Sequence, residues 1–109
     1  MNEKITVLVV EPGRNPYTKE IYSELEVLQK EVGGYLEVVY PFDDPVCVIC
    51  DEEGKLKGYP LNRALYDDDG SLYDIIAGTF LIAGLTEDDF GSLTEQDIER
   101  FSAMFRLEE

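Results

Sequence analysis

Three short apolar segments of strand length constrain the fold of this chain more than any other feature of its sequence. They span residues 5–10, 46–50 and 79–83, and Gly, Pro or acidic residues follow or bracket each of them. The second segment is apolar at every position, which predicts a strand that is buried on both faces and central in a sheet. We therefore expect a core built on buried strands.

Weaker patterns predict further elements around these strands. Residues 17–22 lie within hairpin distance of the first strand, and residues 35–40 form another strand candidate. Residues 56–59 indicate a short return strand, and residues 61–65 indicate a helical turn. The run Asp67-Asp68-Asp69-Gly70 has the composition of an exposed acidic loop.

The first of two expected helices begins behind Ser23. Ser23 and Glu26 have the spacing of a capping box, and Gly33-Gly34 supplies a residue that can adopt the left-handed conformation at the helix end. A start near Asn15-Pro16 is the alternative, because the apolar residues that follow also recur on one helical face. The later start is the preferred interpretation.

The final helix is expected over residues 94–105, with Thr94 as its N-cap. The length of 109 residues fits one domain. We therefore expect a single small α+β domain with two main helices and a mostly antiparallel sheet of about four to six strands. Within residues 1–109, the core is assigned to residues 4–85 and an acidic C-terminal helical segment to residues 86–109.

The chain is strongly acidic, with 24 Asp and Glu against 9 Lys and Arg and a formal net charge of -15. Residues 67–109 carry most of this excess. Such a surface repels nucleic acid and anionic membranes, so we expect no direct nucleic acid binding, no membrane binding and a basic protein surface as the partner. The candidates for this interaction surface are Asp67, Asp68, Asp69, Asp74, Glu87, Asp88, Asp89 and Glu95. A solvated acidic face is the more common interpretation of such residues.

The absence of histidine from the sequence excludes Ser-His and Cys-His catalytic pairs and imidazole metal sites. Cys47 and Cys50 have C-x-x-C spacing, but in a strand their side chains point to opposite faces and cannot share a metal. We interpret them as buried, inert cysteines in a reducing compartment. No catalytic residue is assigned.

The glycine and acidic motifs do not match known ligand loops. If Gly70 were the sixth residue of a calcium loop, Leu65 and Ile76 would occupy the positions that need Asp and Glu. Neither glycine-rich phosphate-binding fingerprint occurs. We therefore expect no metal and no cofactor.

The segment 55–63 holds three of the nine basic residues, including Arg63. Its preferred interpretation is a turn in which Asn62 and Arg63 bond to neighbouring backbone or acids. If an anionic ligand exists, Arg63 is the first candidate to bind it, with Asn62 beside it.

Four different motifs follow one another in the sequence, in residues 28–37, 51–56, 60–64 and 76–80. In them the sequence resembles the bacterial and phage family catalogued as domain of unknown function 3846. The resemblance implies a small domain that mobile elements and phages often carry. It brings no catalytic residues to this chain, and it covers the segment after Leu85 least.

Two functional hypotheses follow from these observations. The first is a non-enzymatic accessory or protein-interaction protein, with a nucleic acid mimic as its sharpest form. The alternative is a small carboxylate-dependent enzyme or ligand-binding domain near Asn62 and Arg63, which requires a hollow where Arg63 and an acid converge. The start of the sequence lacks the pattern of a secretory signal, and no apolar run is long enough to span a membrane, so we expect a cytoplasmic protein.

Overall fold

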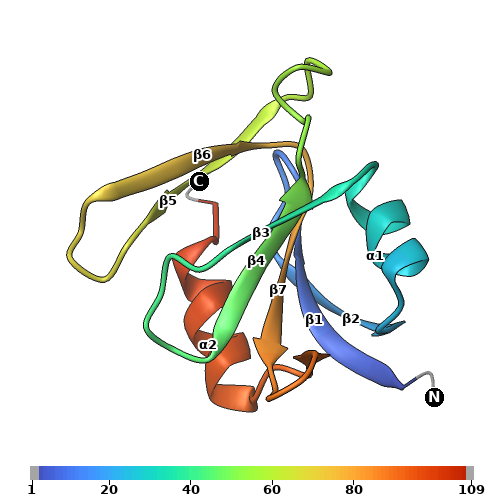
Figure 1. The fold of residues 1–109 in the computed structure, drawn as a ribbon. Coiled ribbons are helices and arrows are strands. Elements are labelled where there is room, and N and C mark those ends of the chain that lie inside the picture. The colour runs from blue at the N-terminus through green and yellow to red at the C-terminus, as the bar shows by residue number, and fades with distance from the viewer. Residues whose placement is uncertain (1–2, 108–109) are drawn as a thin grey trace.

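The computed structural model describes residues 3–107 and shows one domain built from a six-stranded sheet, two helices and a separate two-stranded ribbon (Figure 1). The elements in chain order are β1 (Lys4–Val10), β2 (Tyr17–Tyr22), α1 (Leu25–Val32), β3 (Leu36–Val39), β4 (Val46–Asp51), β5 (Leu61–Tyr66), β6 (Leu72–Ala77), β7 (Phe80–Leu85), β8 (Phe90–Gly91) and α2 (Glu95–Met104). The main sheet has the order β2-β1-β7-β4-β3, with β8 beside β7, and its strands pair antiparallel. The predicted α+β class is confirmed.

The main sheet is covered on both faces. Alternate residues of its central strands fall into two separate clusters, because successive side chains of a strand point to opposite faces. Leu28 and Val32 of α1 pack into the cluster on one face, and Phe101 of α2 packs into the cluster on the other. The sheet is therefore the middle layer of three, with α1 and α2 on opposite sides (Figure 1).

The central strands match the sequence prediction. Every residue of β4 is buried, and β7 is buried from Phe80 to Gly84. Cys47 lies in the cluster beside α1 and Cys50 in the cluster beside α2, which confirms that the two thiols occupy opposite faces. Burial raises the pKa of each thiol to about 12, so both stay protonated at neutral pH.

Helix α1 starts later than either sequence interpretation predicted, and the capping box at Ser23 was wrong. The residue before the helix is Glu24, whose side chain makes no capping bond. Ser23 instead continues the β1–β2 ladder, since its backbone N–H donates to the carbonyl oxygen of Glu3 at 2.9 Å. The predicted end is confirmed, because Gly33 closes the helix at a φ of 98°.

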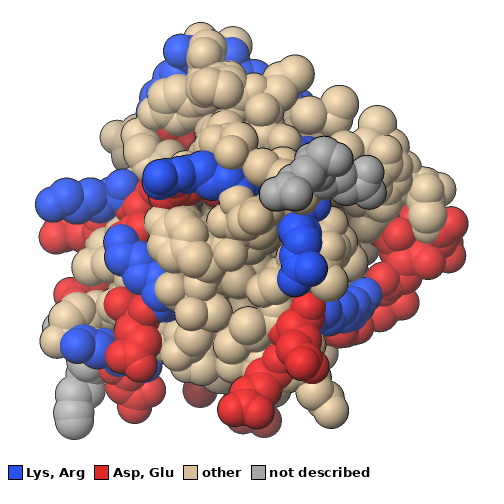
Figure 2. Space-filling model, turned by 180° about the vertical axis from the view of Figure 1, so that it is seen from behind, with Lys and Arg blue, Asp and Glu red and all other residues tan. Residues whose placement is uncertain are grey.

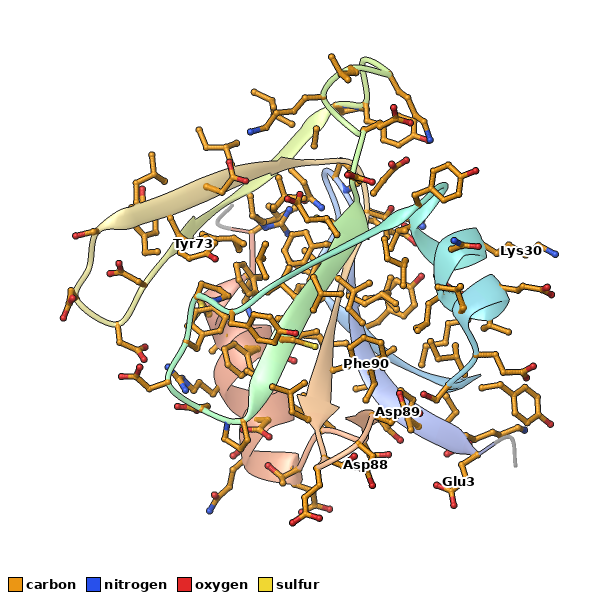
Figure 3. The ribbon with its side chains drawn as sticks, in the orientation of Figure 1. Glu3, Lys30, Tyr73, Asp88, Asp89 and Phe90 are labelled. Atoms are coloured by element: carbon orange, nitrogen blue, oxygen red, sulfur yellow. The ribbon has the colours of Figure 1, made fainter. Side chains whose placement is uncertain are left out.

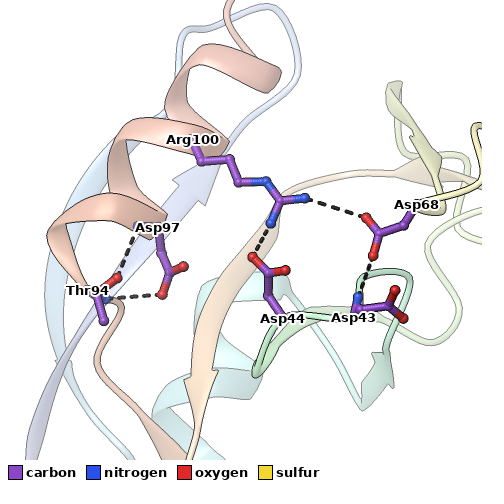
Figure 4. Close-up of polar contacts among 6 residues, drawn as sticks. All are labelled: Asp43, Asp44, Asp68, Thr94, Asp97 and Arg100. Carbon is purple, nitrogen blue, oxygen red and sulfur yellow. Dashed lines mark hydrogen bonds and ion pairs between the residues drawn. The ribbon is translucent and has the colours of Figure 1, made fainter.

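Helix α2 confirms the predicted cap at Thr94. The Thr94 hydroxyl accepts a bond from the Asp97 backbone N–H at 3.1 Å, and the Asp97 carboxylate accepts one from the Thr94 N–H at 3.3 Å (Figure 4). These bonds fix the start of α2. Phe101 and Phe105 are buried in the sheet cluster, so the core includes residues beyond position 85.

The stretch between β4 and β7 differs most from the sequence prediction. Residues 56–59 form turns instead of a return strand, and residues 61–65 belong to strand β5 instead of a helical turn. β5 pairs with β6, a strand that the sequence analysis did not identify, and the short β8 was also missed. The composition of 61–65 suits a helix, but pairing with β6 and contacts to distant backbone override this local preference.

Candidate functional site

The ribbon formed by β5 and β6, residues 61–77, is the candidate functional region. It crosses one end of the molecule beside the main sheet (Figure 1), and its two strands pair with each other. An acidic turn joins the strands, in which Asp67 Oδ1 accepts bonds from the backbone N–H groups of Asp69 and Ser71, both at 3.0 Å. The predicted acidic loop is therefore the tip of this ribbon.

Asn62, near the start of β5, holds this end of the ribbon (its root) against the main sheet. Its Nδ2 donates to the carbonyl oxygens of Val10 at 2.8 Å and Gly78 at 2.9 Å. Its Oδ1 accepts from Nη1 of Arg63 at 2.6 Å. Asn62 thus joins β5 to the end of β1 and to the junction of β6 with β7, where Gly78 has a φ of 84° that favours glycine.

Arg63 binds protein oxygens in the same region. Its Nε and Nη2 donate to the carbonyl oxygen of Phe105 at 3.1 and 2.8 Å, and Nη2 also donates to that of Arg14 at 2.7 Å. Burial lowers the pKa of the Arg63 guanidinium. The guanidinium caps the carbonyl end of α2, where a cation is favoured by the helix dipole.

Asn62 and Arg63 therefore bond to backbone, as the sequence analysis preferred, but they do so from strand β5 instead of a turn and reach residues far away in the chain. Four of the five N–H groups of the Arg63 guanidinium donate to protein oxygens: one from Nε, one from Nη1 and two from Nη2. Both Asn62 Nδ2 contacts go to backbone carbonyls. A ligand role for these two residues stays a prediction.

Ion pairs fasten the ribbon at two further points. Lys55 Nζ lies 2.9 Å from Asp74 Oδ1 of β6. At the tip, Arg100 of α2 pairs with Asp44 and lies 3.5 Å from Asp68 Oδ1 (Figure 4). Asp68 Oδ2 also accepts from the backbone N–H of Asp43 at 2.6 Å, and its charge raises the pKa of the Asp43 carboxyl.

The turns before the ribbon are fastened by Asp51, the buried charged residue of the described chain. Its Oδ2 accepts from Lys57 Nζ at 2.8 Å, and its Oδ1 accepts from the Glu53 N–H at 2.8 Å. Lys57 Nζ also donates to the Gly33 carbonyl at 3.1 Å. Burial alone would raise the pKa of Asp51, but the bonds from Lys57 and Glu53 lower it below its usual value.

The predicted acidic surface is divided between two places. Asp67, Asp68, Asp69 and Asp74 belong to the ribbon, whereas the other candidates Glu87, Asp88, Asp89 and Glu95 are exposed around β8 and the start of α2. Figure 3 places Asp88 and Asp89 at the end of the molecule away from Tyr73 of the ribbon. On the face in Figure 2, Lys, Arg and uncharged side chains separate the acidic groups.

Large apolar side chains are exposed on the ribbon, and the sequence analysis did not single them out. The exposed fractions are 68% for Leu61, 54% for Tyr66, 56% for Leu72, 44% for Tyr73 and 38% for Ile75. These five are among thirteen exposed large hydrophobic residues in residues 3–107. Three of them, Leu72, Tyr73 and Ile75, lie on β6, and the β-branched and aromatic content of that segment was the sequence signal for a strand.

A hollow lies where the ribbon meets α2. Its volume is about 260 Å³, and it is lined by Phe42, Arg63, Ala64, Tyr66, Asp67, Asp68, Met104 and Phe105. Arg63 and two of the acidic candidates thus line one concavity. A second hollow of about 240 Å³ lies beside β6, and its lining includes Asp74, Lys55, Glu37 and Cys50.

A metal centre and a membrane span are two other classes of site. Residues 3–107 bring together no group of three or more Cys, Asp or Glu residues that could hold a metal ion. Neither helix of this part of the chain has the length and apolar character that a membrane crossing needs.

Comparison with protein families gives a match over nearly the whole chain. Residues 5–106 match the model of a family described as a domain of unknown function (DUF3846). Searches of curated proteins and of solved structures found no significant match. The match extends through α2 and covers the sheet, the ribbon and the hollow between them, so the chain belongs to the DUF3846 family.

Proposed function

We propose that this chain is a non-enzymatic protein-interaction domain that binds a basic partner through the β5–β6 ribbon. The observation that carries the proposal is the exposure of five large apolar side chains within residues 61–77. Exposed apolar groups that cluster on one element and are rimmed by polar residues are typical of interaction sites. The acidic tip of the ribbon supplies such a rim.

The backbone of the ribbon supports the same proposal. β5 and β6 pair with each other and form a sheet that is separate from the main one. A two-stranded ribbon keeps an outer edge on each strand, and such edges bind extended segments of other chains by strand addition. Aromatic side chains such as Tyr66 and Tyr73 are also common among the residues that dominate binding energy.

The charge of the chain indicates the chemistry of the partner. A net charge of -15 raises the rate of encounter with basic surfaces and opposes encounter with acidic ones. The division of the acidic residues into two places does not resemble the long regular stripe of a DNA mimic. Binding of a basic protein is therefore preferred to mimicry.

The setting of this function is part of the proposal. The free, buried thiols Cys47 and Cys50 support a reducing compartment such as the cytoplasm. The role as an accessory protein of a mobile element or phage rests on the implied setting of the family and stays a prediction.

One observation favours the alternative of a ligand-binding domain. Arg63, Asp67 and Asp68 line the same hollow, as that hypothesis required. However, Arg63 has one N–H group left for an anion, and the two carboxylates beside it oppose an anionic ligand. The hollow suits a cationic group better.

Affinity capture with matched variants tests the proposal. Wild-type protein, the ribbon variant Leu72→Ser/Tyr73→Ser and the control Leu25→Ser/Tyr35→Ser are immobilised and exposed to extract of the native host. Leu25 and Tyr35 are 60% and 69% exposed and lie outside the ribbon. We expect a partner that the wild type and the control retain, that the ribbon variant loses and that high salt elutes. Equal retention by the ribbon variant, or no salt-sensitive partner, contradicts the proposal.

A further inference from the structure

We infer that the hollow between β5 and α2 receives a basic side chain, Lys or Arg, of the partner protein. This inference rests on the proposed function and names the anchor residue that the ribbon recognises. The hollow is defined by its volume of about 260 Å³ and by the lining residues given above. That volume lies below the range usual for drug-sized ligands and suits a single side chain.

The walls of the hollow are apolar. Phe42 and Phe105 are buried and form part of the core beneath it, whereas Met104 and Tyr66 are 45% and 54% exposed beside it. Lys and Arg side chains carry apolar stems of several methylene groups and bury them against such surfaces. An aromatic ring beside the hollow also attracts a cation.

The rim of the hollow carries two carboxylates. Both backbone N–H groups that donate to the Asp67 carboxylate bond to its Oδ1, and Asp67 Oδ2 accepts no hydrogen bond from residues 3–107. Asp68 contacts Arg100 at a long distance of 3.5 Å. A Lys or Arg side chain with its methylene groups against the apolar wall would therefore bring its charged group to Asp67 Oδ2. A charge-assisted hydrogen bond there is stronger than a neutral one.

Arg63 also lines the hollow, and its positive charge opposes the binding of a second cation there. Its N–H groups point to the Phe105 and Arg14 carbonyls and to Asn62, and it neutralises the carbonyl end of α2. Asp67 and Asp68 outnumber it on the lining. The remaining local balance is negative, which favours a cationic guest over an anionic or a neutral one.

A titration with two small probes tests the inference. ¹H–¹⁵N correlation spectra of the full chain are recorded at low salt with N-acetylarginine amide and with the neutral N-acetylnorleucine amide. We expect the arginine probe to shift the amide signals of Tyr66, Asp67 and Met104, and the neutral probe to bind more weakly.

Two variants that remove one charge each provide the matched comparison. Asp67→Asn keeps the side-chain oxygen that accepts the turn bonds, and Asp69→Asn changes a neighbouring acid that does not line the hollow. We expect Asp67→Asn to weaken arginine binding roughly three- to fivefold, the range of a partly exposed ion pair, and Asp69→Asn to leave it unchanged. Equal weakening by both variants, equal binding of both probes, or no shift at the hollow overturns the inference.

The outcomes separate this inference from the proposed function. If a partner is lost by Leu72→Ser/Tyr73→Ser but retained by Asp67→Asn, and the arginine probe does not bind, the interaction role stands and the anchor in the hollow is wrong. If the arginine probe binds as expected but the ribbon variant retains every partner, the hollow recognises cations and the proposed ribbon function is wrong.

Discussion

The main sheet and the β5–β6 ribbon are stabilised in different ways. In β4 every residue is buried, and the central strands place alternate side chains in apolar clusters on both faces. In the ribbon, Leu65, Ile76 and Ala77 are buried, while Asn62, Arg63 and the ion pairs of Asp68 and Asp74 connect it to the remainder. Leu65 and Ile76 anchor the ribbon in the apolar cluster on the α2 face of the sheet, and the polar contacts hold the remainder. The ribbon therefore keeps large apolar side chains exposed, and this difference is the basis of the proposed function.

The largest expected effect is on the sheet. Phe80 is fully buried and packs edge-to-face on Phe105 with ring centroids 5.4 Å apart. Phe80→Ala should lower the free energy of unfolding by about 3–5 kcal/mol, because it leaves a cavity between the sheet and α2. Chemical denaturation measures the change, and a loss below 1 kcal/mol would show that the sheet does not carry the stability.

A smaller and more local effect is expected at the root of the ribbon. Asn62→Ala leaves the carbonyls of Val10 and Gly78 without their donor, at a cost of about 2 kcal/mol. Hydrogen exchange should show that amides of β6 lose more protection than amides of β4. Asn15→Ala is the control, since Asn15 accepts one exposed bond from the Leu107 N–H. Uniform loss of protection in β4 and β6 contradicts a separately fastened ribbon.

The same contrast explains what the sequence could predict. Runs such as Val46–Cys50 are buried on both faces, so their composition alone indicated strands and their central place. The segment Leu61-Asn62-Arg63-Ala64-Leu65 was misread, because its strand conformation depends on pairing with residues 72–77 and on bonds to Val10, Gly78 and Phe105. These contacts join residues far apart in the chain. The hollow also combines residues from three segments, so no local pattern could indicate it.

The turns that lead into the ribbon should respond to pH through Asp51. The folded state lowers the pKa of this carboxyl, so its stabilising effect is present above the unfolded value and is lost as pH falls through the folded value. Asp51→Asn should cost about 1–2 kcal/mol at pH 7, the scale of a charge-assisted bond to a partly exposed lysine. The cost should shrink below pH 4, near the unfolded value.

Glu52→Gln is the control for this pH dependence, because it removes one charge from an exposed neighbour of Asp51. Denaturation at pH 3 and pH 7 measures both variants against the wild type. A cost of Asp51→Asn that is the same at both pH values would show that the carboxylate charge does not fasten the turns.

The smallest effect on stability is expected at the exposed apolar residues of the ribbon. Leu72 is 56% exposed, so Leu72→Ser should change the free energy of unfolding by less than about 0.5 kcal/mol. Leu25→Ser on α1, where the side chain is 60% exposed, is the matched control for folding. If Leu72→Ser alone lowers the free energy of unfolding by several kcal/mol, the Leu72 side chain stabilises the fold.

The central claim is that the ribbon is the surface by which this chain binds a partner. Hydrogen–deuterium exchange of the protein alone and in complex with a captured partner tests it residue by residue. The account predicts slower exchange in residues 61–77 and near Met104 on binding, with unchanged exchange at the β2 edge of the main sheet. Protection that falls on β2 or β3 and leaves the ribbon unchanged would contradict it.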